Sequence, residues 1–126
     1  MLKKDVLRGS RNFSAVYNGG KSAGSRYVVI FYRKNQLPYN RTAYLASKKV
    51  GNAVSRNRAK RLMKESVRSM GDFPFSGYDI IFIARNSINH RKCGEVRRSV
   101  ESALRKTDML KKKNNKKEKR REKSRR

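Results

Sequence analysis

Three segments of this 126-residue chain have the apolar, β-branched and aromatic composition that is typical of β-strands. They are Tyr27–Tyr32, Thr42–Ser47 and Tyr78–Ala84, and the last of them, YDIIFIA, is the clearest. A turn region around Asn35–Asn40, which contains Pro38, separates the first two. Each run has the length of a strand and is too short to span a bilayer.

Three further segments repeat their apolar side chains at helical spacing. The first is Ser10–Gly20, for which the serine is the expected N-terminal cap and Gly19-Gly20 the stop. The second runs from about Ala53 to Met70, with Asn52 as its cap, and the third from about Gly94 to Lys106. These elements predict an α+β single-domain sandwich with one sheet packed against helices. The full order that we expect is α-β-β-β-α-β-α, which has one strand more than the three runs above locate.

The last sixteen residues, 111–126, contain no apolar side chain and carry 11 Lys or Arg against 2 Glu. Such a segment has nothing to bury, so we expect it to be disordered, or helical only on a partner. We therefore place a folded domain at residues 1–110 and a basic tail at residues 111–126.

The whole chain carries 35 Lys or Arg against 9 Asp or Glu, which gives a formal net charge of +26. Self-repulsion at that charge opposes a compact fold, and a polyanionic partner relieves it. Nucleic acid is the first candidate, and the lack of a long apolar run argues against a membrane. DNA is not expected, because the pattern contains neither a helix-turn-helix nor a dimerisation heptad. The single Cys93 cannot form an internal disulfide, which fits a cytoplasmic location.

The positive charge is concentrated in the second predicted helix and the residues just before it. The stretch Ser47–Leu62, SKKVGNAVSRNRAKRL, contains six Lys or Arg and no Asp or Glu. At about 100° per residue, one arc of this helix carries apolar side chains and a different arc carries basic ones. A solvated surface helix would pair Glu with Lys four residues apart, which this helix mostly lacks. We interpret the basic arc and its approach as a phosphate-binding face formed by Lys48, Lys49, Asn52, Arg56, Asn57, Arg58, Lys60, Arg61, Lys64 and Arg68.

No pattern of catalytic or metal-binding residues accompanies this face. Cys93 and His90 are close in sequence but lack a third group to orient them, and Asp72 and Asp79 lack metal-ligand spacing. We therefore expect no catalytic residue and no metal ion bound by the protein alone.

The stretch SKKVGNAVSRNRAKRLMKE, residues 47–65, closely resembles the signature of the bacterial ribonuclease P protein subunit, in which an Arg-Asn-Arg run enters a basic helix. In this chain the run is Arg56-Asn57-Arg58. The resemblance covers roughly residues 3–110, in the family's order, through Leu7–Gly20, Arg26–Tyr32, Tyr78–Arg85 and Glu95–Lys106. Residues 41–49 depart from it, because the family usually has more Gly and Val in this strand.

The resemblance implies that the basic helix connects two parallel strands by a left-handed crossover, contrary to the usual rule. It also implies that the basic face contacts the catalytic RNA subunit of ribonuclease P. A cleft between the sheet and the first helix would hold the single-stranded 5′ leader of precursor tRNA, since aromatic rings offer stacking faces to unpaired bases. The matching cleft residues are Phe13, Tyr17, Val29 and Phe31. From the residues alone, these four fit an ordinary core at least as well.

By the same resemblance, the RNA subunit carries out the hydrolysis, with Mg²⁺ held mainly by the RNA and the substrate. The chain would then be a subunit of a ribonucleoprotein endoribonuclease that acts in tRNA 5′ maturation. An alternative from another class is a ribosomal or ribosome-assembly RNA-binding protein without a catalytic role, which would share the high charge and the basic tail. The Lys48–Lys64 signature, together with Phe13 and Tyr17, favours ribonuclease P.

Overall fold

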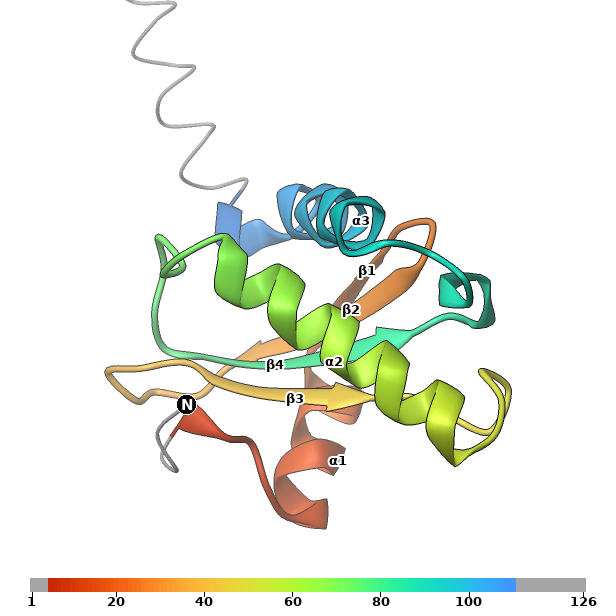
Figure 1. The fold of residues 1–126 in the computed structure, drawn as a ribbon. Helices are drawn as coiled ribbons and strands as arrows, with labels where there is room; N and C mark the ends of the chain where they lie inside the picture. Colours follow the sequence, from red (N-terminus) through yellow and green to blue (C-terminus); the bar gives the residue numbers. More distant parts are fainter. Residues whose placement is uncertain (1–4, 111–126) are drawn as a thin grey trace, which may run out of the picture.

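The computed structural model describes residues 5–110. A four-stranded sheet lies between α1 on one face and α2 and α3 on the other (Figure 1). The elements are α1 (Ser10–Gly19), β1 (Lys21–Gly24), β2 (Val28–Lys34), β3 (Arg41–Leu45), α2 (Ala53–Ser69), β4 (Tyr78–Ala84), the short 3-10 helix η2 (Asn86–Ile88) and α3 (Cys93–Arg105). The predicted α+β class and the order α-β-β-β-α-β-α are confirmed. The basic tail lies outside the described residues.

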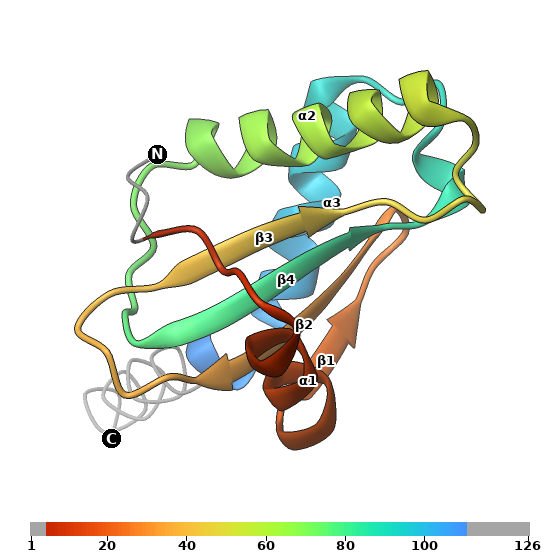
Figure 2. The same cartoon turned by 90° about the horizontal axis from the view of Figure 1, so that it is seen from below.

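β4 is a central strand of the sheet although it is the last strand in the sequence. The strand order is β1-β2-β4-β3, so that β4 pairs antiparallel with β2 and parallel with β3. α2 connects β3 to β4 across one face, and the two views show that this crossover is left-handed (Figure 1, Figure 2). The connection implied by the family resemblance is therefore present, against the usual right-handed rule.

The main core lies between the sheet and the two helices α2 and α3. Val28 and Ile30 of β2, Phe82 of β4 and Met63 of α2 are completely buried there. The ring of Tyr44 stacks on that of Phe82, with centroids 5.1 Å apart. Burial alternates along the first five residues of β2, because neighbouring residues of a strand point to opposite faces.

A smaller apolar cluster lies on the opposite face, beneath α1 and the segment before it. Its buried members are Leu7, Val16, Ala43 and Ile81. α1 ends against β2 at Gly20, where an added Cβ atom would lie 2.4 Å from the carbonyl oxygens of Val16 and Tyr32. Only a glycine lets the end of α1 approach the sheet this closely.

Two local details differ from the sequence prediction and one agrees. Ser10 does not cap α1: it is the first helical residue, Gly9 precedes it with φ of 89°, and no side chain caps this end. The hydrophobic pattern does not locate β1, because KSAG lacks large apolar side chains and its first half is exposed. Asn52 does cap α2, and its side-chain oxygen accepts a hydrogen bond of 3.0 Å from the backbone N–H of Ser55.

A partly buried ion pair joins β3 to β4 at one end of the sheet. The guanidinium of Arg41 donates hydrogen bonds of 2.7 and 2.6 Å to the two carboxylate oxygens of Asp79. The side-chain amide of Asn35 donates to the same carboxylate at 2.9 Å. The hydrogen bonds between Arg41 and Asp79 raise the pKa of Arg41. Asp79 therefore links β4 to β3 through its side chain, a role that the sequence analysis did not assign to it.

Candidate nucleic-acid interface

α2 buries one side and presents a cationic side to solvent. The buried side consists of Ala59, Leu62, Met63, Ser66 and Val67. Among the predicted binding residues of the helix, the exposed ones are Asn57, Arg61, Lys64 and Arg68, and the half-buried ones at the borders are Arg56, Arg58 and Lys60. No ion pair within residues 5–110 involves a basic side chain of α2. We call these seven residues the basic face of α2, and an anion could approach most of them without breaking an internal pair.

Four predicted binding residues lie apart from the rest of the basic face or are engaged elsewhere. The guanidinium of Arg58 donates a hydrogen bond of 2.8 Å to the backbone carbonyl of Arg91, which draws it away from the rest of the basic face. Asn52 is engaged in capping α2. Lys48 and Lys49 are exposed in the turn before α2, near a helix end whose free amides also favour anions.

The four predicted cleft residues come together on the opposite face of the sheet. Phe13 and Tyr17 lie one turn apart on α1, and Val29 and Phe31 lie two residues apart on β2. The rings of Tyr17 and Phe31 meet edge to face, with centroids 5.1 Å apart. Tyr17 is 40% exposed and the other three are half-buried. Partial burial raises the pKa of the Tyr17 phenol, so this ring stays neutral and keeps its hydroxyl proton.

β3 and β4 add residues to this face that the sequence analysis did not assign to it. In the sheet register, Ile83 lies beside Val29, and Leu45 lies beside Ile83 on its other side. Both remain half-buried because α1 covers only part of the face (Figure 2). The register of β3 against β4 would have placed Leu45 here, but neither pairing nor register is visible in the sequence. We define the open sheet face as Phe13, Tyr17, Val29, Phe31, Leu45 and Ile83.

A groove of about 1100 Å³ connects the open sheet face to the basic face of α2 at the edge of the sheet formed by β3. Phe13 and Leu45 contribute to it from the open sheet face. Arg61, Lys64 and Arg68 contribute to it from α2. The two predicted surfaces, which come from separate segments of the sequence, therefore form one continuous concave surface.

This surface offers basic side chains that can bind phosphates and aromatic side chains on which bases can stack. Within residues 5–110, no three His, Cys, Asp or Glu side chains are grouped so that they could hold a metal ion. No helix in the same part of the chain has the length and apolar character needed to cross a membrane. The arrangement is suited to binding a polyanion that also exposes unpaired bases.

The family model described as Ribonuclease P matches residues 1–108. The chain belongs to the ribonuclease P protein family. A ribonuclease P protein component from Caldanaerobacter subterraneus subsp. tengcongensis is 38% identical over 111 residues, which cover 88% of this chain and 96% of that protein. One from Clostridium botulinum is 43% identical over 112 residues, again covering 88% of this chain and 96% of that protein.

Solved ribonuclease P proteins have the same fold. The protein from Staphylococcus aureus matches with a TM-score of 0.75 at 27% identity, covering 84% of this chain and 97% of that chain. The protein from Thermotoga maritima matches with a TM-score of 0.72 at 30% identity, covering 82% and 97%. Membership of the family gives this chain a role in ribonuclease P, a ribonucleoprotein endoribonuclease, and favours that role over the ribosomal alternative.

Proposed function

We propose that the chain binds the catalytic RNA of ribonuclease P with the basic face of α2 and holds the 5′ leader of precursor tRNA on the open sheet face. Both contacts promote endonucleolytic removal of the leader. The observation that carries this proposal is the continuity of the two surfaces at the edge formed by β3. A single strand that leaves a structured RNA needs phosphate contacts and stacking contacts in succession, and this surface offers both.

The open sheet face suits unpaired nucleotides. Its apolar side chains are half-buried, and Tyr17 leaves 40% of its surface accessible beside Phe31. Stacking a base on an aromatic ring contributes about 1–3 kcal/mol and requires no particular sequence. A paired RNA helix keeps its base faces stacked inside, so a single-stranded leader is the expected ligand.

The basic face of α2 suits the phosphate backbone of the catalytic RNA. Arg61 and Arg68 can each grip a phosphate by two parallel hydrogen bonds, and Lys64 adds a compact charge. Each such contact releases condensed counterions, which favours binding at low salt. The catalytic RNA and precursor tRNA repel each other through their phosphates, and cations between them lower that repulsion.

The proposal assigns hydrolysis to the catalytic RNA. The carboxylate, thiol and imidazole groups of residues 5–110 do not form a cluster that fits a metal ion. Mg²⁺ held mainly by RNA and substrate would supply the activated water. The protein raises the affinity for precursor tRNA and organises the RNA near the cleavage site.

Cleavage of precursor tRNA by a bacterial-type catalytic RNA at low magnesium tests the proposal. The RNA alone should be nearly inactive there, the protein alone should cleave nothing, and the two together should restore cleavage. A leaderless tRNA serves as the control for binding, since it should bind the complex more weakly than precursor tRNA does. Cleavage by protein freed of all RNA would refute the division of labour. Failure to stimulate any such RNA would refute the role as a whole.

A further inference from the structure

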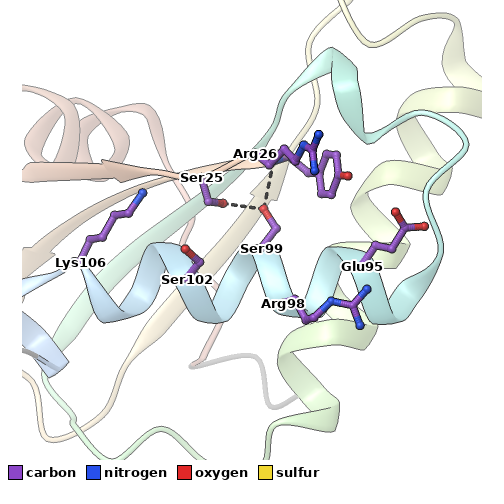
Figure 3. Close-up of a pocket in the computed structure, with 8 residues that line it drawn as sticks. Ser25, Arg26, Glu95, Arg98, Ser99, Ser102 and Lys106 are labelled. Atoms are coloured by element: carbon purple, nitrogen blue, oxygen red, sulfur yellow. Dashed lines mark hydrogen bonds between the residues drawn. The ribbon is translucent and has the colours of Figure 1, made fainter.

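A separate pocket of about 340 Å³ lies between α3 and the turn that joins β1 to β2 (Figure 3). None of its lining residues belongs to the groove beside β3 or to the open sheet face. Arg98 and Ser102 of α3 line it together with Lys106, the residue that follows α3, and Arg26 lines it from the turn. Nothing in the proposed function uses these residues.

The floor of this pocket is fixed by hydrogen bonds. The hydroxyl oxygens of Ser25 and Ser99 are 2.5 Å apart, and Ser99 also accepts a hydrogen bond of 3.0 Å from the backbone N–H of Tyr27 (Figure 3). When the Ser25 hydroxyl donates to the carbonyl of Val28, which lies 3.2 Å away, Ser99 donates to Ser25. Both hydroxyl protons are then used internally. The network holds the turn against α3 and leaves ligand binding to the side chains around it.

Three basic side chains surround this floor. The ammonium of Lys106 donates a hydrogen bond of 2.8 Å to the carbonyl of Gly24, which places the charge at the turn. The guanidinium groups of Arg26 and Arg98 donate no hydrogen bond and form no ion pair within residues 5–110. Two exposed guanidinium groups thus line the pocket with their hydrogen-bonding capacity unused within residues 5–110.

The one carboxylate in the lining is already engaged. One oxygen of Glu95 accepts a hydrogen bond of 3.3 Å from the backbone N–H of Lys92. Its other oxygen lies 3.6 Å from a guanidinium nitrogen of Arg91. Since Arg91 offsets this single negative charge, the pocket as a whole is cationic.

Positive charge continues from this pocket to α2. The guanidinium groups of Arg26 and Arg91 lie 5.9 and 5.2 Å from the centre of the Tyr27 ring. Arg58 of α2 in turn donates its hydrogen bond to the backbone carbonyl of Arg91. These contacts connect the pocket to the basic face of α2 through a chain of neighbouring arginines, which is the arrangement that an extended polyanion would follow.

We infer that this pocket binds a phosphodiester of an RNA backbone, as a second contact with the same catalytic RNA that the basic face of α2 binds. Two unengaged guanidinium groups match the oxygens of a phosphate. The pocket offers no exposed ring for a base, because its only aromatic residue, Tyr27, is 6% exposed. The inference rests on the proposed function, to which it adds a contact on a different helix.

The salt dependence of binding to the catalytic RNA alone, without precursor tRNA, tests this contact in the full chain. Because the two arginines are inferred to hold one phosphodiester, the double variant Arg26→Gln with Arg98→Gln should lower the magnitude of the slope of log affinity against log salt by roughly 0.7–0.9, and each single variant by part of that amount. Arg97→Gln is the matched control, because it removes the same charge from the neighbouring position of α3, where Arg97 pairs with Glu101 outside the pocket. The control should keep the wild-type slope.

Thermal melting of each variant shows whether it is folded, and all three positions are exposed, so their melting temperatures should stay close to that of the wild type. An equal loss of slope in Arg97→Gln and Arg98→Gln would show a general charge effect and overturn the inference. An unchanged slope in the folded double variant would overturn it as well. If the wild-type chain fails to bind the catalytic RNA, the proposed function itself is refuted, and that result needs no variant.

Discussion

The two faces of the sheet differ in how completely helices cover them. On the side of α2 and α3, Val28 and Ile30 are completely buried in a large continuous core. On the side of α1, Val29 and Phe31 of the same strand remain half-buried above a much smaller cluster. One strand therefore stabilises the fold with its even-numbered residues and leaves apolar surface accessible with two of its odd-numbered ones.

This difference separates stability from recognition. A face closed by two helices gains most of its burial when the chain folds, so it has little left to gain from a ligand. The open sheet face keeps apolar surface in contact with water, and a contiguous exposed apolar surface on a charged protein is typical of a binding site. The cationic residues of α2 border the open side only at the edge formed by β3, where the groove begins.

The largest expected effect is on stability at the closed face. Phe82→Ala should lower the free energy of unfolding by about 3–5 kcal/mol, because the side chain is completely buried and its removal leaves a cavity beside Tyr44. Phe31→Ala, on the half-buried side, should cost clearly less. Denaturant unfolding of the two variants measures both values. Equal losses at the two sites would mean that the open sheet face is ordinary core.

The next effect concerns leader binding at the open face. Phe13→Ala should lower the affinity for precursor tRNA by about 1–3 kcal/mol, because a stacking surface is lost, and should leave the affinity for mature tRNA unchanged. Binding of the two RNAs to the same preparation measures this. Phe75→Ala is a suitable control, since this half-buried ring packs against the main core and not on the open face. If Phe13→Ala lowers the affinity for both RNAs equally, the open sheet face does not bind the leader.

A smaller effect is expected when the basic face is altered at the groove. The double substitution Arg61→Gln and Lys64→Gln removes two phosphate contacts. The magnitude of the slope of log affinity for the catalytic RNA against log salt should therefore fall by roughly 1.4–1.8. Stability should hardly change, because both side chains are exposed. Arg97→Gln combined with Arg105→Gln removes the same charge from α3 and provides the comparison. If this control lowers the slope equally, α2 has no special part in binding.

The smallest effect is a pH dependence of the closed face. Burial raises the pKa of Tyr44 to about 12, against an ordinary value of 10.0. Between these two values the unfolded chain loses this proton first, so the contribution of Tyr44 to stability is complete below pH 10 and is lost as the pH rises toward 12. Tyr44→Phe cannot ionise, so its stability relative to wild type should rise by about 1.4 kcal/mol between pH 9 and pH 11. Unfolding curves at those two pH values measure the difference, and a constant difference would contradict the prediction.

How far the sequence predicts the fold depends on how local the cause is. The apolar run of β4 and the capped, one-sided pattern of α2 appear within a few residues of the predicted limits, since each is encoded in its own segment. β1 is not predictable in this way. Its residues have weak strand character, and it forms because β2 offers it an edge, with Lys21 opposite Tyr32. The left-handed crossover has no local signal at all and came from the family resemblance.

The same distinction applies to the binding surfaces. The basic face of α2 can be predicted because one helix holds nearly all of it and the helical period places its residues. The members of the open sheet face come from α1, β2, β3 and β4, so the pairing register decides which side chains share it, and Leu45 and Ile83 were missed for that reason. The pocket beside α3 cannot be predicted from the sequence in this way, because Arg26 and Arg98 come to line the same pocket only after folding.

The position of β4 between its two partners also has a consequence in time. β2 and β3 do not pair with each other, and both pair with β4, which begins at Tyr78. Paired residues of β2 and β4 are 44 to 56 positions apart, and such distant contacts slow folding because long loops must close first. A chain that has emerged from the ribosome only as far as α2 already carries its cations but has no completed sheet behind them. Assembly of the sheet is therefore set by the synthesis of the last strand.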